Sequence, residues 1–268
     1  MTTTSTGRPE PLIDPRIRDR RREIRRREGR RRLRRLAALG AGATFVVSGV
    51  LVVLSPALDV DRLAVRGAVR TDVAEVARAS GIEVGAPMAT FLASKAAERV
   101  ETLPWVARAR VSRSWPSTVV VTIDERTPAA IATAGGDGRK VLVDADGRQL
   151  AVTGDDGGVP AISGLDFTPA PGVLLGEAAS GALELATHLA AAFPDRRLSV
   201  VVDGGGALEA RITGADGGEV RSLVGEPDRI PAKVLALASV LEQAGSEPPP
   251  AVVDVRAPDA PALTRASS

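Results

Sequence analysis

A run of twenty-three residues without a charge, Leu36–Leu58, constrains this chain more than any other feature. As a helix rising about 1.5 Å per residue it would be roughly 34 Å long, enough to cross a hydrocarbon core of about 30 Å. Fourteen arginines lie within residues 1–35, whereas Asp59 and Asp61 follow the apolar run. The positive-inside rule therefore predicts one signal-anchor helix, with residues 1–35 in the cytoplasm and the chain after Asp59 outside.

Two other interpretations of this region are weaker. Small residues at 55–57 resemble a cleavage site, but a basic stretch of this length and an apolar run far above about 7–15 residues are unlike a signal peptide. The arginines alone would resemble a nucleic-acid-binding arm. Beside a membrane span they are better explained by topology and by attraction to anionic lipids. We therefore expect a membrane partner and no nucleic acid.

Residues 59–126 have the pattern of a small α+β domain. A short strand is followed by a helix with Thr71 as N-cap, which ends at Gly81. A second amphipathic helix ends before Pro104, and two strands then flank a turn at Trp115-Pro116. The predicted order is β-α-α-β-β.

The chain contains only two tryptophans, Trp105 and Trp115, on either side of one predicted strand. Each would cover one end of a three-stranded sheet packed on two helices. We expect both to serve packing rather than ligand stacking.

Residues 127–257 are predicted to form a second domain with a mixed α/β sheet. "KVLVDADGRQL" is typical of a hairpin with Asp-Gly at its turn. A calcium loop there is disfavoured because leucine and threonine stand where the first and last ligands should be. Helices are expected over 178–193 and 230–244, with strands between them and a closing strand near 251–256. Residues 258–268 are expected to be a Pro-rich tail.

The sequence offers no set of catalytic or metal-binding residues. Cysteine is absent, and the only histidine, His188, lies within an apolar helical pattern. None of the three lysines, Lys95, Lys140 and Lys233, has a serine three residues before it, so the Ser-x-x-Lys nucleophile of transpeptidases is missing. Phosphate-binding glycine loops are also missing. We therefore expect no enzyme, no cofactor and no metal.

Several short motifs occur in a fixed order between residues 65 and 130. They are Val65-Arg66-Gly67, Gly81, Gly85, Leu103-Pro104-Trp105-Val106, Ala109, Val111, Arg113, Trp115-Pro116, Glu125-Arg126, Pro128 and Ala130. Together they resemble the POTRA domain of the FtsQ/DivIB family of bacterial cell-division proteins. The likeness extends over residues 33–265 and includes the Pro-x-Ile-x-Gly segment at 160–164 and Lys233 at the start of a helix.

This resemblance implies a non-enzymatic scaffold of the divisome. Such a protein would be a single-pass type II protein of the cell membrane, enriched at the division septum, and would recruit or link other division proteins through its extracytoplasmic domains. The alternative is a POTRA-containing envelope secretion or assembly factor. The implied organisation is a tail (1–35), an anchor (36–58), a POTRA domain (59–126), an FtsQ-type β domain (127–257) and a C-terminal tail (258–268).

The resemblance also implies where partners bind. FtsB-like and FtsL-like proteins would add a strand to the closing strand by β-augmentation, and other division proteins would use the POTRA domain. The closing strand reads as an edge strand, with pairing limited to Ala251–Ala257 because Pro258 and Pro261 interrupt the chain. Alanine at 257 replaces the aromatic residue typical of the family. The predicted partner-binding residues are Val252, Val253, Asp254, Val255, Arg256, Ala257, Arg196 and Arg197.

Overall fold

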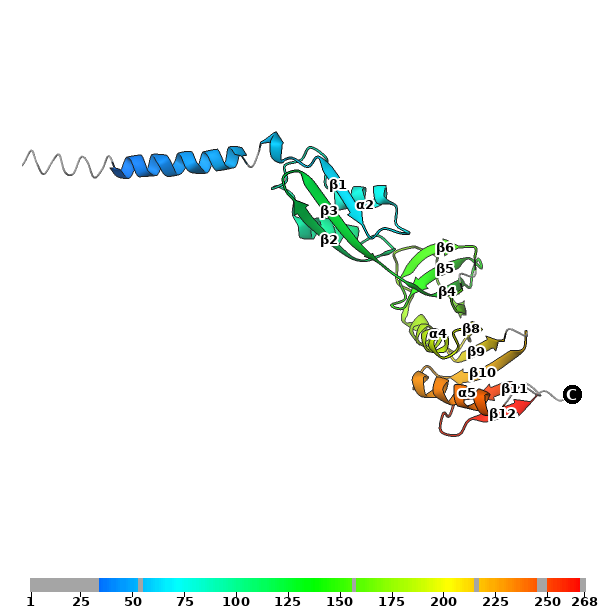
Figure 1. Ribbon diagram of the computed structural model, residues 1–268. Coiled ribbons are helices and arrows are strands. Elements are labelled where there is room, and N and C mark those ends of the chain that lie inside the picture. Colours follow the sequence, from blue (N-terminus) through cyan, green and yellow to red (C-terminus); the bar gives the residue numbers. More distant parts are fainter. Residues whose placement is uncertain (1–33, 53–54, 156–157, 215–216, 245–249, 266–268) are drawn as a thin grey trace, which may run out of the picture.

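The computed structural model describes residues 34–52, 55–155, 158–214, 217–244 and 250–265. Figure 1 shows an isolated N-terminal helix followed by two units that each contain a sheet. The helix, Arg34–Val52, has a mean hydropathy of 1.7, and none of it is buried in the protein. It fits the predicted single membrane span, whereas most of the basic tail lies outside the described residues.

The first unit has the predicted β-α-α-β-β order. A short 3₁₀ helix, η1 (Pro56–Leu58), precedes it, and its elements are β1 (Arg62–Arg66), α2 (Val73–Ser80), α3 (Ala93–Val100), β2 (Val106–Ser114) and β3 (Thr118–Glu125). The sheet order is β1-β3-β2, with β1 parallel and β2 antiparallel to β3. Val76 of α2 and Val100 of α3 pack on Val121 and Ile123 of β3, so both helices cover one face of the sheet.

The helix cap differs from the prediction by one residue. Asp72, not Thr71, is the N-cap of α2, and its Oδ1 accepts the Ala74 N–H at 3.0 Å. The Thr71 N–H is instead donated to Glu125 Oε1 at 2.8 Å, a contact between residues 54 apart in sequence. Gly81 ends the helix in the left-handed region with φ 64°, as predicted.

The second unit is one mixed sheet with helices on one face. Its strands run in the order β12-β11-β10-β9-β8-β7-β4-β5-β6. Its elements are β4 (Pro128–Ala134), β5 (Lys140–Asp144), β6 (Gln149–Thr153), β7 (Ala161–Leu165), η2 (Glu177–Ala179), α4 (Ser180–Ala192), β8 (Arg197–Val202), β9 (Leu208–Thr213), β10 (Glu219–Gly225), α5 (Ile230–Ala244), β11 (Pro250–Asp254) and β12 (Ala262–Arg265). Leu185 and Leu189 of α4 and Leu237 of α5 pack into the same buried core as Val200 and Val253.

The end of this sheet contradicts two predictions. The closing strand β11 is not at the edge, because it lies between β10, to which it is parallel, and β12, to which it is antiparallel. Residues beyond Pro258 do pair, since β12 lies within the expected tail. Pro258 and Pro261 fall in the turn between the two strands, where they remove no hydrogen-bond donor from the ladder.

The two units are joined by a short, hydrogen-bonded junction. The Arg126 guanidinium donates to Asp144 Oδ2 at 2.6 Å and to the Val106 carbonyl at 3.2 Å, which links β5 to the start of β2. Asp144 Oδ1 accepts the N–H groups of Asp146 and Arg148 at 3.0 and 2.8 Å. The Asp-Gly segment is therefore the predicted hairpin turn, and its buried carboxylate is occupied by protein donors.

Candidate partner-binding surface

The residues predicted on the closing strand divide between the core and the open face of the sheet. Val253 and Val255 are fully buried beneath α5, so their side chains are unavailable to a partner. Val252 and Asp254 lie on the opposite, open face and are half-buried. Arg256 and Ala257 are exposed beyond the end of β11. Apolar Val253 and Val255 alternate in the sequence with Val252, Asp254 and Arg256, the pattern of a strand with one buried and one open face.

The free backbone edge belongs to β12. Its register with β11 pairs Val252 with Thr264 and Asp254 with Ala262. Within the described ranges no other strand pairs with β12. Ala262 and Thr264 are exposed, whereas Leu263 packs against the core. An extended partner could therefore hydrogen-bond to β12 directly, but could reach β11 only by displacing β12.

Arginine contacts hold β12 at both ends. Arg229 Nη1 lies 3.1 Å from Asp259 Oδ2 in the turn before β12, and Arg265 Nη2 donates to the Ala244 carbonyl at 3.2 Å at the end of α5. Arg229 has φ 47°, an uncommon backbone conformation for a residue other than glycine. The position of the edge strand thus depends on α5.

A buried lysine anchors the start of α5. Lys233 Nζ donates to the Glu226 carbonyl at 2.8 Å and to Asp228 Oδ1 at 2.5 Å, although only 2% of its side chain is exposed. This hydrogen bond from Lys233 lowers the pKa of the Asp228 carboxyl below its usual range. The lysine that matches the family pattern is therefore a structural residue of the β10–α5 turn.

Arg196 and Arg197 lie far from Arg256. They follow α4 at the start of β8, and both are exposed at the mouth of a cavity of about 780 Å³. The strand register aligns Arg197 of β8 with Thr213 of β9, and Thr213 with Glu219 at the start of β10. The two arginines therefore lie at the end of the sheet where β11 begins. Since Arg256 follows the opposite end of β11, the structure does not bring the predicted basic residues together.

A charged cluster on the open face was not predicted. Glu209 of β9 contacts Arg221 of β10 at 2.6 Å and Arg211 at 3.0 Å. Burial alone would raise the pKa of Glu209, but hydrogen bonds from Arg221 and Arg211 outweigh it and lower the pKa. Period-two alternation in "LEARIT" and "EVRSLVG" puts these side chains on one face and could have identified them. Each charge has a partner, so the cluster is typical of a solvated sheet face.

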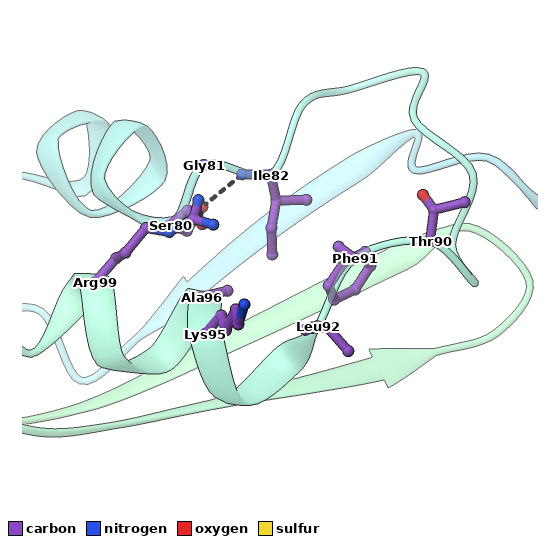
Figure 2. A pocket seen from close by; sticks show the side chains of 9 residues that line it. All are labelled: Ser80, Gly81, Ile82, Thr90, Phe91, Leu92, Lys95, Ala96 and Arg99. Atoms are coloured by element: carbon purple, nitrogen blue, oxygen red, sulfur yellow. Dashed lines mark hydrogen bonds between the residues drawn. The ribbon is translucent and has the colours of Figure 1, made fainter.

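The POTRA-like unit contains a separate small pocket, shown in Figure 2. Its volume is about 300 Å³, and it lies between the end of α2, the loop 81–92 and the start of α3. The Ser80 and Thr90 hydroxyls donate to the carbonyls of Ala77 and Pro87 at 2.7 and 2.8 Å, so neither is activated by a base. The nine lining residues include two cations, Lys95 and Arg99, and no acid.

Metal chemistry finds no support in the part of the chain that the structure describes. There, no group of three or more His, Asp or Glu side chains could hold an ion. His188 is half-buried within α4, between residues of an apolar face. The described surface carries an exposed strand edge at β12, an exposed basic pair at the start of β8 and charged side chains on the open sheet face.

Comparisons with known proteins point to one family. Residues 58–126 match the FtsQ-type POTRA domain family. The chain is 33% identical over 137 residues to the cell division protein FtsQ of Corynebacterium glutamicum, which covers 50% of this chain and 60% of that protein. It is 31% identical to FtsQ of Mycobacteroides abscessus, covering 80% of this chain and 64% of the relative. The chain is 30% identical to FtsQ of Mycobacterium tuberculosis, and that alignment covers 85% of this chain and 66% of the relative. The alignments thus cover less than two thirds of these relatives.

Proposed function

Because this chain belongs to the FtsQ family of bacterial cell-division proteins, we propose that it is a membrane-anchored, non-enzymatic scaffold of the divisome. In this proposal the helix Arg34–Val52 holds the protein in the cell membrane, and the two sheet-containing units recruit or link other division proteins outside the cell. The exposed edge of β12, held in place by Arg229 and Arg265, is the observation that carries the proposal.

The expected mode of binding is β-augmentation by an FtsB-like protein, with an FtsL-like protein in the same assembly. The partner strand would pair with β12, and Val252, Asp254 and Thr264 on the open face would meet its side chains. Arg256 and Ala257 would contact a partner that extends past the turn. Val253 and Val255 would contribute only by supporting the strand from the core.

Proline substitutions test this binding mode. Adjacent residues of an antiparallel edge strand direct their N–H groups to opposite sides, so Leu263→Pro and Thr264→Pro remove one outward and one inward donor. The substitution at the outward donor should abolish binding of the FtsB-like protein while circular dichroism stays native. Equal, wild-type binding by both variants, with an intact fold, would exclude the β12 edge.

The basic pair at the start of β8 has an independent test. Reversing Arg196 and Arg197 to Glu should weaken binding of an acidic partner and reduce the salt dependence of its association. The matched control reverses Arg108 and Arg110, an exposed pair of the same charge on β2 of the POTRA domain. Equal effects of both double variants would indicate a general charge effect rather than a binding site.

Localisation and topology test the scaffold itself. A fluorescent fusion of the full chain should concentrate at the division septum, whereas an envelope secretion or assembly factor would be distributed around the cell. Protease added to spheroplasts should remove the chain beyond Asp59 and leave the arginine-rich head protected. Protection of the two sheet-containing units would contradict the proposed orientation.

A further inference from the structure

At the end of the POTRA domain nearest the anchor, two segments are hydrogen-bonded to the connector that follows the apolar run. The Met88 N–H in the loop 81–92 donates to the Leu58 carbonyl at 3.0 Å. The Asp61 N–H donates to the carbonyl of Ser117, in the turn between β2 and β3, at 2.8 Å. Figure 1 shows this end of the sheet beside the chain that leaves the N-terminal helix. These contacts hold the loop and the turn next to the membrane anchor.

Large apolar side chains are exposed at this end. Trp115, in the turn between β2 and β3, is 55% exposed, and Val84 and Leu92 of the loop 81–92 are 69% and 60% exposed. The second tryptophan behaves differently: Trp105 lies half-buried at the other end of β2, with the Arg70 guanidinium 4.9 Å from its ring centre. Packing within the domain accounts for Trp105 but leaves most of Trp115 uncovered.

Measured from Leu58, the end of the apolar run, chain length keeps Trp115 within reach of the lipid headgroups. Asp61 is three residues beyond Leu58, which at about 3.5 Å per residue limits their separation to roughly 10 Å. The turn that contains Trp115 is hydrogen-bonded to Asp61 through Ser117. The headgroup region extends about 5–7 Å beyond the hydrocarbon core on each side, and tryptophan is enriched there because it is apolar with one N–H donor.

Charge at this end is balanced. Arg62 and Lys95 are exposed, and neither side chain has an ion-pair partner among the residues that the structure describes. Asp61 and Glu83 are exposed nearby and offset them. Attraction to a membrane would therefore come mainly from the apolar side chains, and would depend little on the fraction of anionic lipid.

We propose that the anchor-proximal end of the POTRA domain docks on the headgroup region of the membrane in which the chain is anchored, with Trp115 inserted in the interface and Val84 and Leu92 beside it. The docking fixes the direction in which the two sheets project from the membrane. This inference rests on the proposed membrane anchoring and adds a second contact with the bilayer.

The two tryptophans allow a direct test in the full chain reconstituted into phosphatidylcholine nanodiscs with brominated acyl chains. Trp105→Phe leaves Trp115 as the only emitter, and Trp115→Phe leaves Trp105. Bromine near the glycerol end of the acyl chains should quench Trp115 strongly and leave Trp105 unchanged. Equal emission from Trp115 in brominated and ordinary lipid would overturn the inference.

Further variants separate this inference from the anchoring itself. Phe45→Trp, in a chain with both native tryptophans replaced by Phe, reports the apolar helix in nanodiscs whose acyl chains carry bromine near their methyl ends, at the depth of mid-helix. Quenching of this reporter without quenching of Trp115 would refute docking and leave the anchor intact, whereas no quenching of either would refute both.

Charge substitutions provide the matched control. Val84→Asp should reduce the quenching of Trp115, whereas Val69→Asp should not, because Val69 is 87% exposed at the opposite end of the domain. Raising the anionic lipid fraction should change the quenching little. A steep rise would mean electrostatic adsorption and would overturn the apolar insertion proposed.

Discussion

The two sheets of this molecule end in different ways. In the POTRA domain the last strand, β3, lies at the centre of the sheet, and its final residue, Glu125, accepts the N–H groups of Val69, Arg70 and Thr71 at 2.8–3.0 Å. In the second unit the last strand described, β12, lies at the edge with one strand neighbour, held by Arg229 and Arg265. The first arrangement completes a domain, whereas the second leaves an edge strand that has one paired neighbour, one partly buried side chain and exposed arginine contacts.

The comparison indicates which end can accept a partner at low cost. Removing β3 would separate β1 from β2 and expose the core, because β3 carries three buried residues, Val119, Val121 and Ile123. Residues of β12 are exposed except for the partly buried Leu263. Exposed ion pairs contribute about 0–1 kcal/mol each, so the β12 end can adjust to a partner without unfolding the sheet.

The largest effect is expected at a left-handed glycine in β7 that lies against a carbonyl oxygen of the neighbouring strand. Gly164 in β7 has φ 84°, and a Cβ there would overlap the Val202 carbonyl oxygen of the parallel neighbour β8. Gly164→Ala should cost roughly 3 kcal/mol of unfolding free energy, because strain and overlap add. Urea titration followed by circular dichroism measures it, with Gly154→Ala, which meets no neighbour, as the control. An equal, small effect of both variants would contradict the strain.

The same titration can separate the two units. Both tryptophans lie in the POTRA domain, so their fluorescence follows that unit alone. Gly164→Ala should move the circular dichroism transition and leave the fluorescence midpoint unchanged. A shared shift would mean that the Arg126–Asp144 junction couples the two sheets into one cooperative unit.

A smaller loss is expected at the buried lysine that positions α5. Lys233→Ala removes a buried aliphatic stem and the two hydrogen bonds of the β10–α5 turn, which should cost about 2 kcal/mol. Lys233→Met keeps most of the volume and should cost less, since its partner Asp228 is 61% exposed and can turn to water. Thermal unfolding of both variants measures the difference, and a greater loss with Met would contradict the packing role.

Acid should act on the POTRA domain through Glu125. Burial alone would raise the pKa of Glu125, but backbone hydrogen bonds from Thr71, Val69 and Arg70 outweigh it and lower the pKa. A folded-state pKa below the unfolded value of about 4.3 means that this stabilisation is complete above that pH and is lost as pH falls through the folded pKa.

Glu125→Gln removes this titration and should lower stability at neutral pH by about 1 kcal/mol, because a neutral amide oxygen is a weaker acceptor than a carboxylate. As pH falls below the lowered folded-state pKa of Glu125, the variant and the wild-type chain should converge. Tryptophan fluorescence across a pH series is the measurement. A difference in stability that is the same at every pH would show that the effect does not come from ionisation of Glu125.

The smallest effect is expected at the edge strand. Arg229→Ala removes the exposed pair with Asp259 and should cost about 0.5 kcal/mol globally. Hydrogen exchange should nevertheless accelerate at the amides of β12 and not at those of β10. Arg139→Ala, which breaks an exposed pair with Asp137 in the hairpin before β5, is the matched control and should leave β12 unchanged.

Local patterns in the sequence predicted elements well wherever a single segment carried the signal. The uncharged run after the arginines predicted the apolar helix, and the left-handed glycine at 81 predicted the end of α2. The predictions failed where the hydrogen-bonding partner of a residue lies far away in the sequence. Thr71 looked like a cap, but its N–H is used by Glu125, and β12 was taken for a tail because Pro258 and Pro261 looked like interruptions rather than turn residues.

The sequence by itself determined the anchor, the FtsQ-type POTRA domain and the inward face of β11, because hydrophobic periodicity and capping act within one or two turns of chain. Tertiary structure alone decided which strand is the edge, which end of the sheet carries Arg197, and that Trp115 lies beside the connector to the membrane anchor. Strand order depends on hydrogen bonds between segments far apart in sequence. No local pattern specifies which of several apolar strands will be neighbours.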